Sequence, residues 1–309
     1  MPTVKQQQPS DNPSSKQISE IIKYLIIIGG EKGGVGKSFL TRYLLSFLIR
    51  ESAESEIACY DADPSVDDVY QLFSDKPWME KAFFTLDKYR VQEGSIIVSK
   101  IKPMVIVNLP SNIRKNFDNF CEQNKLFEEE LQQETYETCY FFFVSDGSYQ
   151  SVKLFVEHLE RYKDKPFLKT VLFLNAGQNG NSYDFSYLGN KNDFDVLSNL
   201  ANQIKTYKVP VLTIPELPPL IRFKVDALLS EKGLKFHQLI TKGESELITL
   251  ERLHFQGHLT KFDNLFKELF EFKKTQENNR EIINLEKIKY DDLVKNQETL
   301  RNQERLFVA

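Results

Sequence analysis

The chain has few cysteines, no long apolar run and no excess of positive charge, and each absence excludes a class of protein. The three cysteines, Cys59, Cys121 and Cys139, are odd in number and widely spaced, so they indicate neither a disulfide framework nor a Cys-x-x-Cys metal site. The longest apolar runs, Tyr24–Ile28 and Cys139–Val144, are too short to span a bilayer. A formal net charge of −4 argues against a protein drawn to nucleic acid by its overall charge.

The N-terminal segment also lacks the apolar stretch of a secretory signal. Residues 1–18 are rich in Gln, Pro, Ser and Asn, a composition that predicts a disordered arm. Reduced thiols and the missing signal favour a cytoplasmic protein. With 309 residues, the chain is long enough for one large domain and an appendage.

Short apolar runs alternate with amphipathic stretches over residues 19–243, which is typical of βαβ units around a parallel sheet. The expected strands are Tyr24–Ile28, Glu56–Tyr60, Met104–Asn108, Tyr140–Val144, Thr170–Asn175 and Val211–Ile214. The sequence therefore predicts an α/β fold with a doubly wound, mostly parallel sheet. Residues 65–100 fit this pattern poorly, and we expect an insertion or lid there.

The pattern changes over residues 244–309, where no strand is expected. Apolar side chains from Leu259 to Phe270 form a helical stripe, so this part is predicted to be a helical C-terminal extension. The stripe is interpreted as core, with a partner helix on it as the alternative. His254 and His258 are spaced to share a helix face, but no third ligand is visible and a metal site is disfavoured.

A glycine-rich segment, Glu31–Ser38, lies between a predicted strand and a predicted helix. Backbone N–H groups of such a loop form an anion nest, to which the helix N-terminus adds its positive end. Lys37 would reach the β- and γ-phosphates of a nucleotide, and the Ser38 hydroxyl would coordinate Mg²⁺. ATP and Mg²⁺ are therefore the expected ligands. The residues expected to contact the nucleotide here are Gly33, Gly34, Val35, Gly36, Lys37, Ser38 and Phe39.

The run Lys32–Ser38 resembles the deviant Walker A motif, KGGxGK[ST], of the ParA/MinD ATPases, a SIMIBI-class group that includes the nitrogenase iron protein. The resemblance implies a P-loop ATPase that forms a homodimer on binding ATP, with Lys32 crossing to the partner's phosphates. It also implies slow hydrolysis and a protein partner that stimulates or reads the ATPase. Partition of plasmids or chromosomes, or plasmid mobilisation, is the implied process.

Three further positions follow from the same resemblance. The segment Asp61–Pro64 looks like the family's DxDP switch, in which Asp63 would position the attacking water and, with Ser38, serve the metal. The run Val105–Ser111 resembles the Walker B strand, but Asn108 replaces its aspartate, so we expect weaker Mg²⁺ binding and slow hydrolysis. Asn175 is expected to contact adenine. The expected catalytic residues are Lys32, Lys37 and Asp63.

Two short motifs resemble those of ATPases encoded in plasmid transfer and mobilisation regions, the TraL/StbB kind. They are Phe39 directly after the loop and the run from Asn108 to Ser111. Three alternatives stay open: an ATP-bound scaffold with little hydrolysis, a small-substrate ligase or kinase, and positioning of a non-DNA cargo. The tail has balanced charge, so no membrane anchor is expected. Scattered basic residues form a candidate stripe for nonspecific DNA: Lys205, Lys208, Arg222, Lys224, Lys232 and Lys235.

Overall fold

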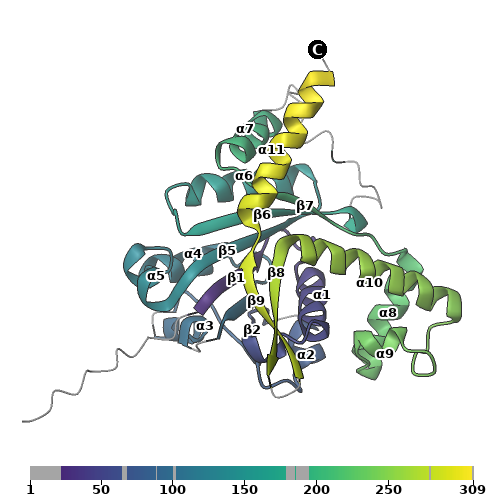
Figure 1. Ribbon diagram of the computed structural model, residues 1–309. Helices are drawn as coiled ribbons and strands as arrows, with labels where there is room; N and C mark the ends of the chain where they lie inside the picture. Colours follow the sequence, from purple (N-terminus) through teal and green to yellow (C-terminus); the bar gives the residue numbers. More distant parts are fainter. Residues whose placement is uncertain are drawn as a thin grey trace, which may run out of the picture.

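A parallel sheet forms the centre of the fold in the computed structural model (Figure 1). The sheet has seven strands in the order β3-β2-β4-β1-β5-β6-β7. The structure describes residues 22–64, 68–87, 89–99, 102–178, 185, 195–277 and 280–307. The arm expected over residues 1–18 lies outside the described residues. The strands are β1 (Ile22–Gly29), β2 (Ile57–Asp61), β3 (Met79–Lys81), β4 (Met104–Asn108), β5 (Tyr136–Ser145), β6 (Leu168–Asn175) and β7 (Val211–Ile214).

Helices cover both faces of this sheet, because its central strands are apolar on both sides. Leu25 and Ile27 of β1 belong to one core cluster, whereas Ile26 and Ile28 belong to the other. The α-helices are α1 (Lys37–Arg50), α2 (Asp68–Phe73), α3 (Ile96–Ser99), α4 (Arg114–Gln123), α5 (Glu129–Thr135), α6 (Tyr149–Tyr162), α7 (Asp195–Thr206), α8 (Pro219–Lys232), α9 (Phe236–Ile240), α10 (Thr249–Leu269) and α11 (Tyr290–Phe307). Helices α4, α6 and α7 pack on one face, and α1, α2 and α8–α10 on the other. The predicted doubly wound α/β fold is confirmed.

All six predicted strands are present, and Met104–Asn108 and Val211–Ile214 have the predicted bounds. The interpretation of residues 65–100 as an insertion was wrong in one respect. Strand β3 lies within that segment and pairs with β2 at the edge of the sheet, and Trp78 beside it is buried. A strand of three residues is too short to show an alternating pattern.

The expectation that no strand follows residue 244 was also wrong. Helix α10 ends at Leu269, and an antiparallel hairpin of β8 (Phe270–Glu277) and β9 (Arg280–Ile288) follows before α11. Phe270 continues the helical spacing of α10, so the change of period was hidden. The extension is nevertheless helical in α10 and α11, as predicted.

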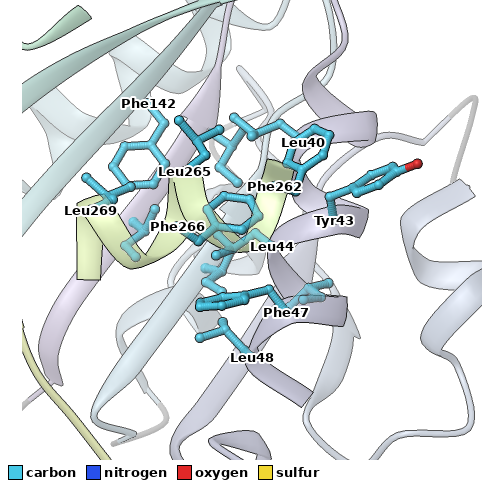
Figure 2. Close-up of a cluster of buried hydrophobic side chains, with 14 of the residues drawn as sticks. Leu40, Tyr43, Leu44, Phe47, Leu48, Phe142, Phe262, Leu265, Phe266 and Leu269 are labelled. Carbon is cyan, nitrogen blue, oxygen red and sulfur yellow. The ribbon is translucent and has the colours of Figure 1, made fainter. Parts of the chain in front are cut away.

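The aromatic stripe of α10 packs against α1, as Figure 2 shows. The ring of Phe262 stacks on Tyr43 with centroids 4.2 Å apart, and Phe266 lies 5.2 Å from Phe47. All four side chains are buried. The stripe is therefore core, as interpreted from the sequence, and it fixes α10 beside the helix that follows the glycine-rich loop.

The end of the chain is attached to the sheet by polar contacts. The Gln297 side chain of α11 bonds both backbone groups of Val211, accepting from its N–H at 3.1 Å and donating to its oxygen at 2.7 Å. This amide occupies the outer edge of β7, where an unpaired strand would otherwise be exposed. The Tyr24 hydroxyl of β1 donates to the Glu286 oxygen of β9 at 2.8 Å.

The three cysteines are buried and form no disulfide, and burial raises the pKa of each thiol. They behave as small apolar side chains. Among the described residues, no helix combines the length and the apolar composition needed to cross a bilayer.

Candidate functional site

The glycine-rich loop lies at the carboxyl end of β1, the strand at which the chain switches from one half of the sheet to the other. Gly34 and Gly36 have φ values of 76° and 105°, in the left-handed region that favours glycine. A Cβ atom on Gly36 would also clash with Nδ2 of Asn175. The loop therefore needs these glycines, and α1 begins directly after it at Lys37.

Lys37 is 6% exposed, and its Nζ donates to Oγ of Ser111 at 3.0 Å and to the backbone oxygen of Lys32 at 3.2 Å. Burial lowers the pKa of Lys37 to about 8, while the charges of Glu31 and Asp63 act in the opposite direction. A buried ammonium whose direct partners are neutral oxygens is stabilised by an anionic ligand. This arrangement suits phosphate.

Lys32 points toward the loop that follows β5 of its own chain. Its Nζ forms an ion pair with Oδ2 of Asp146 at 2.5 Å and donates to Oγ of Ser148 at 3.0 Å. Although burial acts to raise the pKa of Asp146, the hydrogen bonds from Lys32 and Ser148 lower it. Lys32 is thus held by an acid in the single chain.

Asn108 ends β4 beside Asp61, its register partner at the end of β2. The Asn108 amide donates to Oδ1 of Asp61 at 2.9 Å and to Oγ of Ser38 at 3.4 Å, and its oxygen accepts from Thr41 at 3.0 Å. Asp61 and Asn108 are fully buried. Burial raises the pKa of Asp61 to about 6, while hydrogen bonds from Asn108 and two backbone N–H groups oppose this rise. An aspartate in place of Asn108 would set two carboxylates against each other.

The expected metal-binding residues, Ser38 and Asp63, each contact one member of the Asn108–Asp61 pair. Ser38 lies in the first turn of α1 within reach of Asn108. The backbone N–H of Asp63 donates to Oδ1 of Asp61 at 3.3 Å, so Asp63 lies beside the end of β2. Asp61 belongs to the predicted switch segment Asp61–Pro64, but the sequence predicted a role for Asp63 alone. The pairing of two strand ends was the signal that could have found Asp61.

Asn175 contacts the loop itself. Its Nδ2 donates to the Val35 oxygen at 2.8 Å, its Oδ1 accepts from the Gly177 N–H at 3.0 Å, and the residue is 4% exposed. Asn175 also borders a cavity of about 270 Å³ beside the start of α1. The lining residues of this cavity are Gly36, Phe39, Arg42, Asn175, Gly177, Gln178, Pro215, Leu217, Arg222 and Asp226. Asn175 therefore braces the loop where the sequence reasoning expected a contact with adenine.

The donor set fits magnesium. Hydroxyl and carboxylate groups at Ser38, Asp61 and Asp63 offer the oxygen atoms that this ion prefers, directly or through water. Oδ1 of Asp68 is buried beside them without a hydrogen-bond partner. The described residues contain no group of three His, Cys, Asp or Glu side chains spaced to hold a metal by themselves.

The basic residues considered for DNA binding are mostly paired with acids. Lys235 lies 2.9 Å from Asp75, and Lys208 lies 3.9 Å from Glu298. Lys224 pairs with Glu251, and Lys232 pairs with Glu246. These contacts leave less positive charge for DNA phosphates than the sequence suggested.

Comparison with known proteins gives matches among solved structures alone, since no family model and no curated protein matches the sequence. A nucleotide-binding protein from Archaeoglobus fulgidus in complex with ADP shares 12% identity at a TM-score of 0.42, covering 73% of this chain and 95% of its own. The MinD cell division protein of Aquifex aeolicus shares 13% at a TM-score of 0.37, covering 77% and 97%. The cell division ATPase MinD of Pyrococcus furiosus shares 15% at 0.38, covering 78% and 99%. These values are too low for the likenesses to bear on function.

Proposed function

We propose that this chain is a P-loop ATPase of the ParA/MinD type that binds MgATP at Lys32–Ser38 and dimerises when it does so. One observation carries the proposal: the buried ammonium of Lys37 stands in a glycine-constrained loop between β1 and α1 with neutral oxygens as its direct partners. The motif that supplies this loop contains the second lysine, Lys32, by which the family resemblance is recognised.

Each site residue has a role in this proposal. The loop backbone and Lys37 bind phosphate oxygens, and Ser38 coordinates magnesium with Asp61 and Asp63 holding its water shell. Bound magnesium neutralises phosphate charge. Asp63 orients the attacking water. The base occupies the cavity beside Asn175.

The surface around the glycine-rich loop is the proposed contact with a second copy of the chain. Large apolar side chains left exposed among the described residues follow the carboxyl ends of strands or lie at the neighbouring start of α10. They are Phe83, Leu86 and Tyr89 after β3, Tyr149 after β5, Leu220 and Phe223 after β7, and Ile248, Leu250 and Leu253 at α10. Leu250 and Leu253 line one hollow with Pro218, the residue before α8, so the exposed apolar groups of α8 and α10 lie close together, and such a cluster marks an interaction surface. Two such faces in contact would bring each Lys32 to the other chain's phosphates.

The proposed process is slow, dimer-releasing ATP hydrolysis in the cytoplasm, coupled through a protein partner to partition or mobilisation of DNA. Asn108 favours one other candidate, an ATP-bound dimeric scaffold with little hydrolysis, because the amide lacks the charge of the usual aspartate. The acid-paired lysines favour cargo contact through a protein partner over direct binding to DNA.

Phosphate release from MgATP by the purified protein tests the proposal, with and without nonspecific duplex DNA and with Asp63→Ala as the blank. We expect slow release that depends on Asp63, together with a dimer in light scattering that forms with MgATP and is weakened in Lys32→Ala. ATP-dependent dimerisation without release above the blank would select the scaffold. A monomer in saturating MgATP would refute the dimer switch.

A further inference from the structure

A third aspartate faces the metal side of the nucleotide site. Asp68 is the first residue of α2, which packs against α1, the helix that carries Ser38 and Arg42. Burial raises the pKa of Asp68, while Arg42 and Ser38 act against this rise and Asp63 adds to it. The hydrogen bond with Ser38 connects Asp68 to a residue expected to serve magnesium.

One oxygen of this carboxylate is buried and has no hydrogen-bond partner. A buried acceptor left unpaired is destabilising, and such atoms normally bind water or an ion. The position of Asp68 is set by the site itself, because the N–H of Tyr70 in the first turn of α2 donates to Oδ2 of Asp61 at 3.0 Å. The end of β2 thus anchors the first turn of α2, which contains Asp68, beside the site.

We propose that Asp68 supplies, through the water shell of magnesium, the negative charge that Asn108 does not supply at the end of β4. Asn108 approaches Ser38 through its amide nitrogen, which is a donor and therefore cannot accept hydrogen bonds from metal-bound water. Asp68 interacts with the same hydroxyl, and one oxygen of its carboxylate has no hydrogen-bond partner. Asp68 is thus a positioning residue for the metal, and it ties α2 to the nucleotide state. This inference rests on the proposed function.

Binding of Mn²⁺ to the full-length protein saturated with ADP, measured by electron paramagnetic resonance, tests the role of Asp68 without relying on turnover. Asp68→Asn should weaken Mn²⁺ binding about tenfold, as loss of an outer-shell group typically does. ADP affinity in EDTA should stay unchanged. Asp75→Asn is the matched control, because this acid lies just beyond the other end of α2 and pairs with Lys235.

The decisive variant carries both Asp68→Asn and Asn108→Asp, which moves the carboxylate without changing the net charge. Its Mn²⁺ affinity should return to within about threefold of wild type, since the lost and restored groups are equivalent outer-shell ligands. Wild-type Mn²⁺ affinity in Asp68→Asn, or a double variant no better than the single one, would overturn the inference and leave the nucleotide site standing. Failure of the wild-type protein to bind ADP would overturn both.

Discussion

The side-chain amide of Asn108 donates a hydrogen bond to the carboxylate of Asp61 at 2.9 Å, between register partners at the ends of β4 and β2. The family resemblance predicts an aspartate at position 108. The residue there is instead a neutral asparagine, which is hydrogen-bonded to Asp61. The site keeps one negative charge at this point, stabilised by an amide that Thr41 orients from α1.

Replacing Asn108 with aspartate should therefore have two opposite effects. Without metal, the new carboxylate repels Asp61, and the free energy of unfolding should fall by about 1–3 kcal/mol at pH 7. With MgADP the repulsion is screened, and Mg²⁺ affinity should rise. Urea denaturation in EDTA and in MgADP measures both. Asn119→Asp makes the same chemical change on α4 and should alter neither the free energy of unfolding nor the Mg²⁺ affinity. If Asn108→Asp lowered the free energy of unfolding equally in EDTA and in MgADP, the account would be contradicted.

The ion pair between Lys32 and Asp146 predicts a competition between the single chain and the dimer. Asp146→Asn removes the charge that holds Lys32 in its own chain, so the MgATP-dependent dimer should form at a protein concentration several-fold lower. Sedimentation velocity at several protein concentrations measures this change. Glu157→Gln, which disrupts a pair with Arg114 on the neighbouring helix, is the control. A weaker dimer in Asp146→Asn would show that Asp146 supports the interface.

Asn175 can be tested as a brace of the loop against its expected role as a base contact. Asn175→Ala removes the hydrogen bonds to Val35 and Gly177 and loosens the loop. The affinities for ADP and for GDP should therefore fall by the same factor, about tenfold. A contact with adenine would instead be lost for ADP alone. Calorimetric titration with both nucleotides decides, and a loss confined to ADP would restore the expectation from sequence.

His258 predicts part of the acid sensitivity of the fold. It is buried in the aromatic cluster of α10 beside Phe39, and burial lowers its pKa to about 4, with Lys261 adding to this and the backbone of Glu216 opposing it. As the pH falls below the ordinary value of about 6.5, the unfolded chain binds the proton first, so stability is lost between pH 6.5 and 4.

The variant His258→Phe should remove about 2 kcal/mol of the stability difference between pH 7 and pH 5. Urea denaturation at the two pH values measures it, with the exposed neighbour His254→Phe as the control. Asp61 has the opposite effect on stability, because its raised pKa favours the folded state in acid. This effect is the same in the wild type and in His258→Phe, so it cancels in the comparison. An unchanged pH dependence would show that folding does not lower the pKa of His258.

The parts of the fold that sequence predicted are those with a long, local signal. Composition identifies buried strands such as Met104–Asn108, and the helical period of the apolar residues identifies α10, which ends at Leu269. Strand β3 was too short to be identified in this way, and the hairpin after α10 was hidden by a phenylalanine that suits both patterns. The residues of the glycine-rich loop could be predicted because the motif consists of particular residue types at a fixed spacing along the chain. Asp61 and Asp68 could not, because strand register and the placement of α2 bring them to Ser38.

The measurement that tests the central claim most directly is ADP binding by titration calorimetry to the wild-type protein, Lys37→Ala and Lys32→Ala. Loss of the buried ammonium should weaken ADP by about a hundredfold. Lys32→Ala should bind ADP as the wild type does, because Lys32 is held by Asp146 and acts on the partner's nucleotide in the proposed dimer. Wild-type affinity in folded Lys37→Ala would contradict the account, since the nucleotide would then bind somewhere other than this loop.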